Sequence, residues 1–190
     1  MQQKEQPFPT IYLTLVSIVI ALGLEHLLNH VFALEPGGVE RYLVLVQAVA
    51  MFLVLATIWL IYAVLMMAAP WSPRFQDFFA PLLLLVLLYF TIAAIGSSAH
   101  AWFYLVGIGS LAGAVVAHQN FHVASVDKSI DANATPILVC HIGLSILGFG
   151  SGIAVQVGLA ASVGSTILGG IFGAGQLLGA WLVFRWWHAI

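Results

Sequence analysis

Residues 11–30 read IYLTLVSIVIALGLEHLLNH, an apolar run that carries no charge until it reaches Glu25. A helix that crosses the hydrocarbon core of a bilayer needs about 20 mostly apolar residues. The run is therefore long enough for a membrane span, and it closes with a carboxylate and two histidines, His26 and His30. Lys4 precedes the run as in a signal peptide. Because the run is longer than a signal's apolar region, we expect an uncleaved first span.

The composition of the whole chain indicates the same environment. Of the 190 residues, 62% are hydrophobic and only 6% are charged, whereas a soluble domain carries about 25% charged residues. The formal net charge is −2 and there is no basic run, so nucleic acid is not an expected partner. Cys140 is the only cysteine, which excludes an internal disulfide and a four-cysteine metal site. The sequence therefore predicts an integral membrane protein whose partner is the lipid bilayer.

Turn-forming residues divide the chain into six apolar segments. The expected spans are residues 9–33, 41–69, 76–96, 99–123, 136–159 and 163–187, within a single transmembrane domain over residues 1–190. Residues 125–136 are predicted to form the longest loop, with N-cap candidates for the fifth helix at 131–135. Trp102 is expected at the membrane–water interface. These features predict an all-α, polytopic helical bundle with six transmembrane helices.

Six spans place both termini on one side of the membrane. The basic residues divide unequally between the two sides, with Lys4, Arg74, Lys128 and Arg185 on the side of the termini and Arg41 on the other. Because basic residues are enriched in cytoplasmic loops, we expect a protein of the inner or plasma membrane with both termini in the cytoplasm.

Depth in the membrane sorts the histidines and nearby carboxylates into two groups. The outer group comprises Glu25, His26, His30 and His100, and the inner group comprises His118, His122 and His141, with Asp127 nearby. Each group contains two histidines spaced i, i+4, which share one helix face. Two such imidazoles with a third ligand can bind a transition-metal ion, so we predict a metal site at each mouth. The simpler interpretation is that each histidine places its polar tip among the lipid headgroups.

Haem b is the second cofactor that these histidines could hold, because bis-histidine sites take one ligand from each of two helices. His26 with His100 would form an outer site. His141 with His118 or His122 would form an inner site. The arrangement resembles in outline the six-helix b-type cytochromes, on the number and depth of the histidines. That resemblance implies electron transfer across the membrane.

The fourth and fifth segments carry matching stripes of polar and small residues. At about 100° per residue, one stripe comprises His100, Tyr104, Gly107, Leu111, Ala114, His118 and His122, and the other His141, Ser145, Gly148 and Gly152, with Gln156 nearby. If the stripes face each other, they line one seam across the membrane. Because histidine can relay protons, our first functional hypothesis is transport or channel-like conduction of a proton, a cation or a metal ion. The alternatives are a haem- or metal-binding redox subunit and a structural membrane subunit.

Glycine is concentrated in the last two segments. Three pairs are spaced four residues apart: Gly148 with Gly152, Gly169 with Gly173, and Gly175 with Gly179. Small residues at this spacing let membrane helices pack closely. We therefore expect tight helix packing, and one glycine face is a candidate contact for a homo-oligomer or a larger membrane complex. Gln47, Gln156 and Gln176 are expected to form hydrogen bonds between helices.

Overall fold

The computed structural model describes residues 8–35, 40–68, 75–124, 128–160 and 162–187. Six helices account for almost all of these residues: α1 (Phe8–Ala33), α2 (Glu40–Ala68), α3 (Phe75–Ala93), α4 (Ala99–Ala124), α5 (Lys128–Gln156) and α6 (Ser162–Trp187). The described ranges contain no strand. The prediction of an all-α bundle of six helices is confirmed.

The helices have the length and surface of membrane-embedded elements. Five of them, α1, α2, α4, α5 and α6, are long and apolar enough to cross a membrane, and the apolar stretch of α3, Phe79–Ala93, is shorter. Every helix exposes large apolar side chains, including Ile18 on α1, Val49 on α2, Leu83 on α3, Leu111 on α4, Ile146 on α5 and Ile171 on α6. Apolar surface on every helix would be unfavourable in water. The chain is therefore a helical membrane protein surrounded by lipid.

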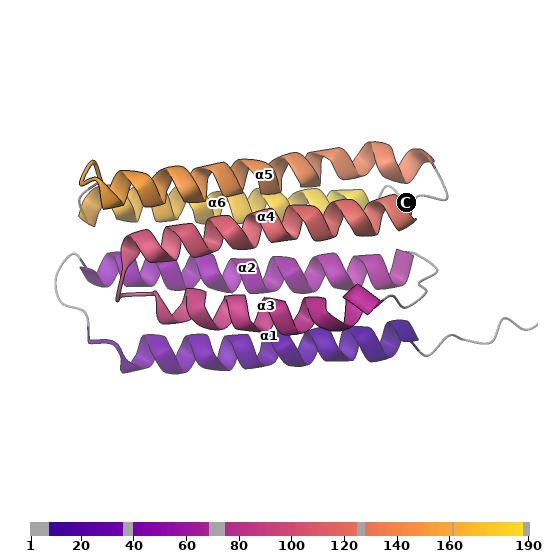
Figure 1. The fold of residues 1–190 in the computed structure, drawn as a ribbon, viewed down its shortest axis with the longest axis horizontal. Helices are drawn as coiled ribbons and strands as arrows, with labels where there is room; N and C mark the ends of the chain where they lie inside the picture. Colours follow the sequence, from indigo (N-terminus) through magenta and orange to yellow (C-terminus); the bar gives the residue numbers. More distant parts are fainter. Residues whose placement is uncertain (1–7, 36–39, 69–74, 125–127, 161, 188–190) are drawn as a thin grey trace, which may run out of the picture.

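The helices pack side by side in a closed ring, in the order α1, α2, α6, α5, α4, α3 and back to α1. Figure 1 shows the ring as three stacked pairs, α5 with α6, α4 with α2, and α3 with α1. The chain alternates direction from helix to helix, so Phe8 and Trp187 lie at the same end of the bundle (Figure 1). Contact around the ring is unequal, because α4 packs extensively on α5 and only slightly on α3.

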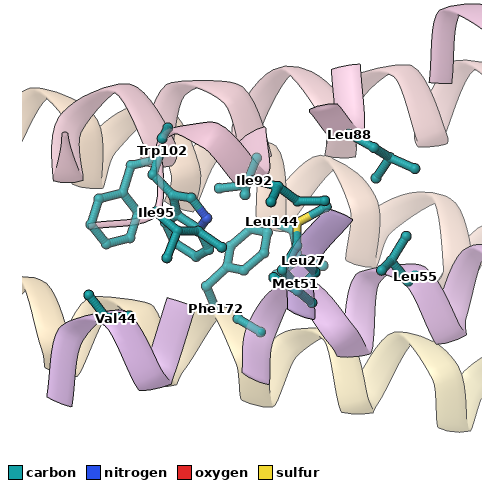
Figure 2. Packing of buried hydrophobic residues seen from close by; sticks show 14 of the residues in the cluster. Leu27, Val44, Met51, Leu55, Leu88, Ile92, Ile95, Trp102, Leu144 and Phe172 are labelled. Atoms are coloured by element: carbon teal, nitrogen blue, oxygen red, sulfur yellow. The ribbon is translucent and has the colours of Figure 1, made fainter. Parts of the chain in front are cut away.

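The main core is built around three aromatic side chains that are fully buried. Trp102 lies against Phe103, with ring centroids 5.1 Å apart, and against Phe172 of α6, with centroids 5.8 Å apart. Figure 2 shows Trp102 beside Ile95, within a cluster that also includes Leu144 and Met51. The expectation of an interfacial Trp102 is therefore wrong. Its side chain points from the first turn of α4 into the bundle, where aromatic packing replaces contact with headgroups.

Two glycines with positive φ end helices. Gly158, at φ 76°, follows α5, and its N–H donates to the carbonyl of Val155 while Leu159 N–H donates to that of Ala154. This pair of bonds is the Schellman arrangement, which satisfies the last carbonyls of a helix. Gly96, at φ 73°, lies in the α3–α4 turn.

The N-terminal end of α5 differs from the prediction. The helix begins at Lys128, eight residues before the expected start at 136, and Pro136 lies inside it. A proline removes one backbone hydrogen bond, but Ala132 and Ala134 favour helix in the preceding segment. The expected loop over 125–136 is thus helical from 128 onwards, and residues 125–127 lie outside the described ranges.

The glycine pairs pack helices against each other within the chain, as predicted. A Cβ atom on Gly148 would lie 2.7 Å from the Cα of Gly107 on α4. On α6, Gly169 faces Val46 of α2, and Gly175 faces Leu144 of α5. These faces are therefore occupied by neighbouring helices, and contact with another chain through them stays a prediction.

Candidate functional site

A cavity of about 350 Å³ lies between α2, α3 and α4. Its walls are residues 51–62 of α2, residues 80–91 of α3 and residues 105–116 of α4. Each stretch rises about 16 Å, at about 1.5 Å per residue. The cavity is therefore a slot that is elongated along the helix axes, and we call it the α2–α3–α4 cavity.

The walls of this cavity are apolar, with a few uncharged polar side chains. The helices α5 and α6 each add one residue to the lining. Each of the five lining helices contributes a buried polar side chain: Thr57 on α2, Thr91 on α3, Ser110 on α4, His141 on α5 and Gln176 on α6. No Asp, Glu, Lys or Arg is among the described residues that line it. A charged group would find no counter-ion here, whereas an uncharged polar group would find hydrogen-bonding partners.

His141 reaches the cavity through a gap left by a glycine. Its side chain is 7% exposed, and a Cβ atom on Gly113 of α4 would lie 3.0 Å from its Cδ2 and 3.3 Å from its Nε2. The ring edge therefore occupies the space that a side chain at position 113 would fill. Its Nδ1 is buried and has no hydrogen-bond partner in the described part of the chain. Buried polar atoms without a partner are rare in folded proteins.

The cavity opens sideways between α3 and α4. Several of its lining residues are also exposed on the outer surface, among them Leu83 and Phe90 on α3, at 68% and 59%, and Ile108 on α4, at 45%. These residues form a rim where the two helices pack only slightly against each other. Because that surface faces lipid, a molecule dissolved in the bilayer could reach the cavity without passing through water.

The residues of the predicted outer site do not converge on one point, and their contacts differ. Nε2 of His30 lies 2.9 Å from the carbonyl oxygen of Ile95, which can only accept, so this nitrogen carries the proton. In the same turn, Gly96 N–H donates to Oε1 of Gln47, at 3.3 Å. His30 and Gln47 therefore cap the turn that follows α3. Gln47 joins α2 to this turn, and its expected hydrogen bond to another helix stays a prediction.

The other outer residues make different contacts, although the ring of His26 lies near that of His30, with centroids 6.2 Å apart and planes at 41°. The ring of His26 stacks on Tyr89 of α3, with centroids 4.2 Å apart and planes at 6°, while Glu25 is exposed. His100 is exposed, lies 3.3 Å from the hydroxyl of Ser98 through Nδ1, and meets the edge of Tyr104. In the described residues, no hydrogen bond or ring contact joins His100 to His26 or His30.

The inner group is also dispersed. His141 lines the α2–α3–α4 cavity, whereas His118 is exposed on α4. The side chain of His122 and the whole of Asp127 lie outside the described residues. Across the described ranges, no three His, Cys, Asp or Glu side chains are close enough to hold a metal ion. Metal and haem sites at the two mouths therefore stay predictions.

The seam between α4 and α5 exists, but it is closed by close packing. Tyr104 donates a hydrogen bond to Oε1 of Gln156, at 2.6 Å, which confirms the expected role of that glutamine. Backbone meets backbone at Gly107 and Gly148, and the ring of Tyr104 covers Gly152. The predicted stripe on α4 is only partly in the seam, because Leu111 is 47% exposed. Helix drift over successive turns carries it away from α5.

Most of the cavity's polar groups are not evident from the sequence. Hydroxyl side chains in membrane helices often bond to their own backbone, as Thr91 does to the carbonyl of Leu87, at 2.7 Å. Such residues give no signal of a site. Gln176 was expected to join helices, and it lines the cavity instead of showing such a bond in the described structure. The signals in the sequence were a histidine, His141, and a glutamine, Gln176, inside spans.

The α2–α3–α4 cavity thus combines apolar walls, buried uncharged polar groups and an opening toward lipid. Sites of this kind hold a small apolar molecule and orient it through one or two hydrogen bonds. Comparison of the chain with protein-family models, with curated proteins and with solved structures found no match.

Proposed function

We propose that this membrane protein binds an uncharged, lipid-soluble molecule with a hydrogen-bonding group, which reaches the α2–α3–α4 cavity from the bilayer. The observation that carries the proposal is the position of His141 and Gln176, two buried polar side chains in a largely apolar slot that opens between α3 and α4. The apolar walls would hold the body of the molecule. The imidazole and the amide would orient its polar group.

The chemistry of the lining narrows the class of ligand. Phosphate and carboxylate groups bind to Arg, Lys or several N–H donors. Neither Arg nor Lys is among the described residues of the cavity. A ligand whose polar group is a hydroxyl or a carbonyl matches the side chains that are present, since His141 and Gln176 can each donate and accept. The cavity volume, about 350 Å³, is at the lower end of the range for small-molecule sites.

The test is to identify what the purified protein retains. The protein is extracted from its membrane in mild detergent, its bound lipids are recovered with organic solvent, and uncharged lipids are quantified by mass spectrometry. Gly109 lines the cavity, and only Leu87 of α3 lies within 4 Å of a Cβ built there. The side chain of Gly109→Leu would therefore fill the gap between α4 and α3.

A matched control carries the same change on the lipid-facing side of α5. A Cβ on Gly150 meets nothing within 4 Å, so Gly150→Leu adds the same side chain away from the cavity. We expect wild type and Gly150→Leu to retain one uncharged lipid species in similar amount and Gly109→Leu to lose most of it. Equal retention by all three proteins would contradict the proposal.

Conduction of a proton, a cation or a metal ion is the second candidate function. It is favoured by buried polar side chains on α5, where His141 Nδ1 and Ser151 Oγ lack a hydrogen-bond partner in the described structure. Against it stands the α4–α5 seam, where backbone contact at Gly107 and Gly148 leaves no space for an ion. Flux into liposomes, measured for wild type and His141→Phe, tests this candidate, because a conducting path through the imidazole requires the variant to lose flux.

A further inference from the structure

A second cavity, of about 260 Å³, lies between α1 and α3. We call it the α1–α3 cavity. Its lining comprises Leu22, Gly23, Glu25, His26 and Asn29 of α1 with Leu85, Tyr89 and Ile92 of α3. The two cavities share no lining residue. The α1–α3 cavity is therefore a separate site from the one proposed above.

The α1–α3 cavity is lined by polar groups that differ in kind from those of the first. Glu25 and Asn29 are spaced i, i+4, so a carboxylate and an amide lie on one face of α1. The ring of His26, also on α1, stacks face to face on the ring of Tyr89 of α3. Nε2 of His26 is buried and has no hydrogen-bond partner within the described ranges. By contrast, Nε2 of His30, one turn later, is hydrogen-bonded to the carbonyl oxygen of Ile95.

The carboxylate of Glu25 is the most informative of these groups. It is exposed on the outside of the bundle, inside the span Thr10–Ala33, and about 12 Å from the end of the helix at about 1.5 Å per residue. A charged side chain at such a position is costly unless it is paired. In the described part of the chain, no Lys or Arg forms an ion pair with it. A cationic group on a bound molecule would supply the counter-charge and remove this cost.

We propose that the α1–α3 cavity binds the headgroup of a phospholipid that carries a primary ammonium group. The carboxylate of Glu25 accepts hydrogen bonds from the ammonium, and the ring of Tyr89 attracts the same cation. The side-chain amide of Asn29 donates to a phosphate oxygen. The position suits a lipid source, because the cavity lies on the lipid-facing surface and toward the end of α1.

A metal ion fits the same residues less well. A structural or catalytic zinc site takes at least three protein ligands, whereas the cavity offers one carboxylate and one imidazole. No group of three His, Cys, Asp or Glu in the described ranges could complete the coordination shell.

The experiment measures which phospholipid the protein retains. The chain is reconstituted in bilayers of equal phosphatidylethanolamine and phosphatidylglycerol with the same acyl chains, re-extracted in mild detergent, and its bound phospholipids are quantified by mass spectrometry. We expect wild type to retain phosphatidylethanolamine in roughly tenfold excess, which is the effect of one charge-assisted hydrogen bond.

Two variants and a control test which residues cause the preference for phosphatidylethanolamine. Glu25→Gln should bring the two lipids to near parity, because the amide keeps the shape but not the charge. Glu40→Gln makes the same change at an exposed carboxylate outside the cavity and should keep the excess. Asn29→Leu should lower retention of both lipids while preserving their ratio, since it removes the contact with phosphate.

Equal retention of the two lipids by wild type would overturn the proposal, as would an excess that survives Glu25→Gln. Zinc is tested on the same samples by metal analysis after incubation with the metal alone. One zinc per chain that Glu25→Gln abolishes, with no lipid preference, would assign the cavity to a metal ion instead.

Discussion

Gly148→Ala tests the closest approach in the bundle, where α5 meets α4. The added Cβ would lie 2.7 Å from the Cα and 2.8 Å from the N of Gly107, and 3.0 Å from the carbonyl oxygen of Phe103. All three are backbone atoms, so no side chain can rotate away. Ordinary contact begins near 3.4 Å, and the two helices must therefore separate by about 0.7 Å. A gap of that size forfeits roughly a quarter to a half of each van der Waals contact across it.

The expected loss of stability is about 2 kcal/mol, within the range for overpacked cores. For a chain of this length that loss corresponds to a fall in Tm of about 4–8 °C. Gly107→Ala should cost less, because its Cβ would lie 3.2 Å from its nearest neighbour, the N of Phe149. Gly150→Ala should cost nothing, because its Cβ meets no atom within 4 Å and alanine favours the helix.

The assay is thermal unfolding of the purified variants in one detergent, followed by circular dichroism. We expect Tm to be lowest for Gly148→Ala, higher for Gly107→Ala and highest for Gly150→Ala. If Gly148→Ala melts at or above Gly150→Ala, the seam is not closely packed, and the objection to a conducting path along it disappears.

Three other perturbations test separate parts of the structure. His30→Ala should lower stability by about 1–2 kcal/mol in the same unfolding assay, because it leaves the buried Ile95 carbonyl without its donor; His30→Gln, which keeps a donor, should recover part of the loss. Gly158→Ala should cost about 1 kcal/mol, because φ at this position is 76°, and an unchanged Tm would argue against the helix end described here. Reporter fusions at both termini should register the cytoplasm, and a C-terminus on the opposite side would overturn either the orientation or the number of crossings.

The helices themselves could be predicted from the sequence because bilayer thickness sets a minimum length for an apolar run. Five of the six predicted starts agree with the structure to within one residue, the first at Phe8 and the last at Ser162 among them. The start of α5 could not be predicted in the same way. Residues 128–135 include five polar side chains and precede a proline. The apolar run therefore begins only at Pro136, whereas the helix begins at Lys128.

The inward faces of the helices were harder to predict. In a soluble protein, apolar residues mark the buried face, but here lipid accepts apolar side chains on the outside as well. Trp102 illustrates the difficulty, because its position along α4 suits an interface while its direction takes it into the core. Polar residues were better guides. Gln47, expected to bond between helices, and His141, on the stripe that could line a seam, are both buried.

The α2–α3–α4 cavity lay beyond sequence analysis for a further reason. Its walls are ordinary apolar residues, and it exists because α3 packs slightly on α4 while α4 packs closely on α5. That difference depends on glycines such as Gly148, whose partner helix the sequence does not identify. The cap formed by His30 likewise depends on a turn 65 residues away along the chain.

A crystal structure of the protein, purified without removal of its native lipids and grown from a lipid phase, would examine the α2–α3–α4 cavity itself. We expect elongated density between α3 and α4, with one polar atom within hydrogen-bonding distance of His141 or Gln176. A cavity closed by contact of α3 with α4, or filled by a chain of ordered waters leading to His141, would contradict ligand binding from the bilayer. The second of these results would favour conduction.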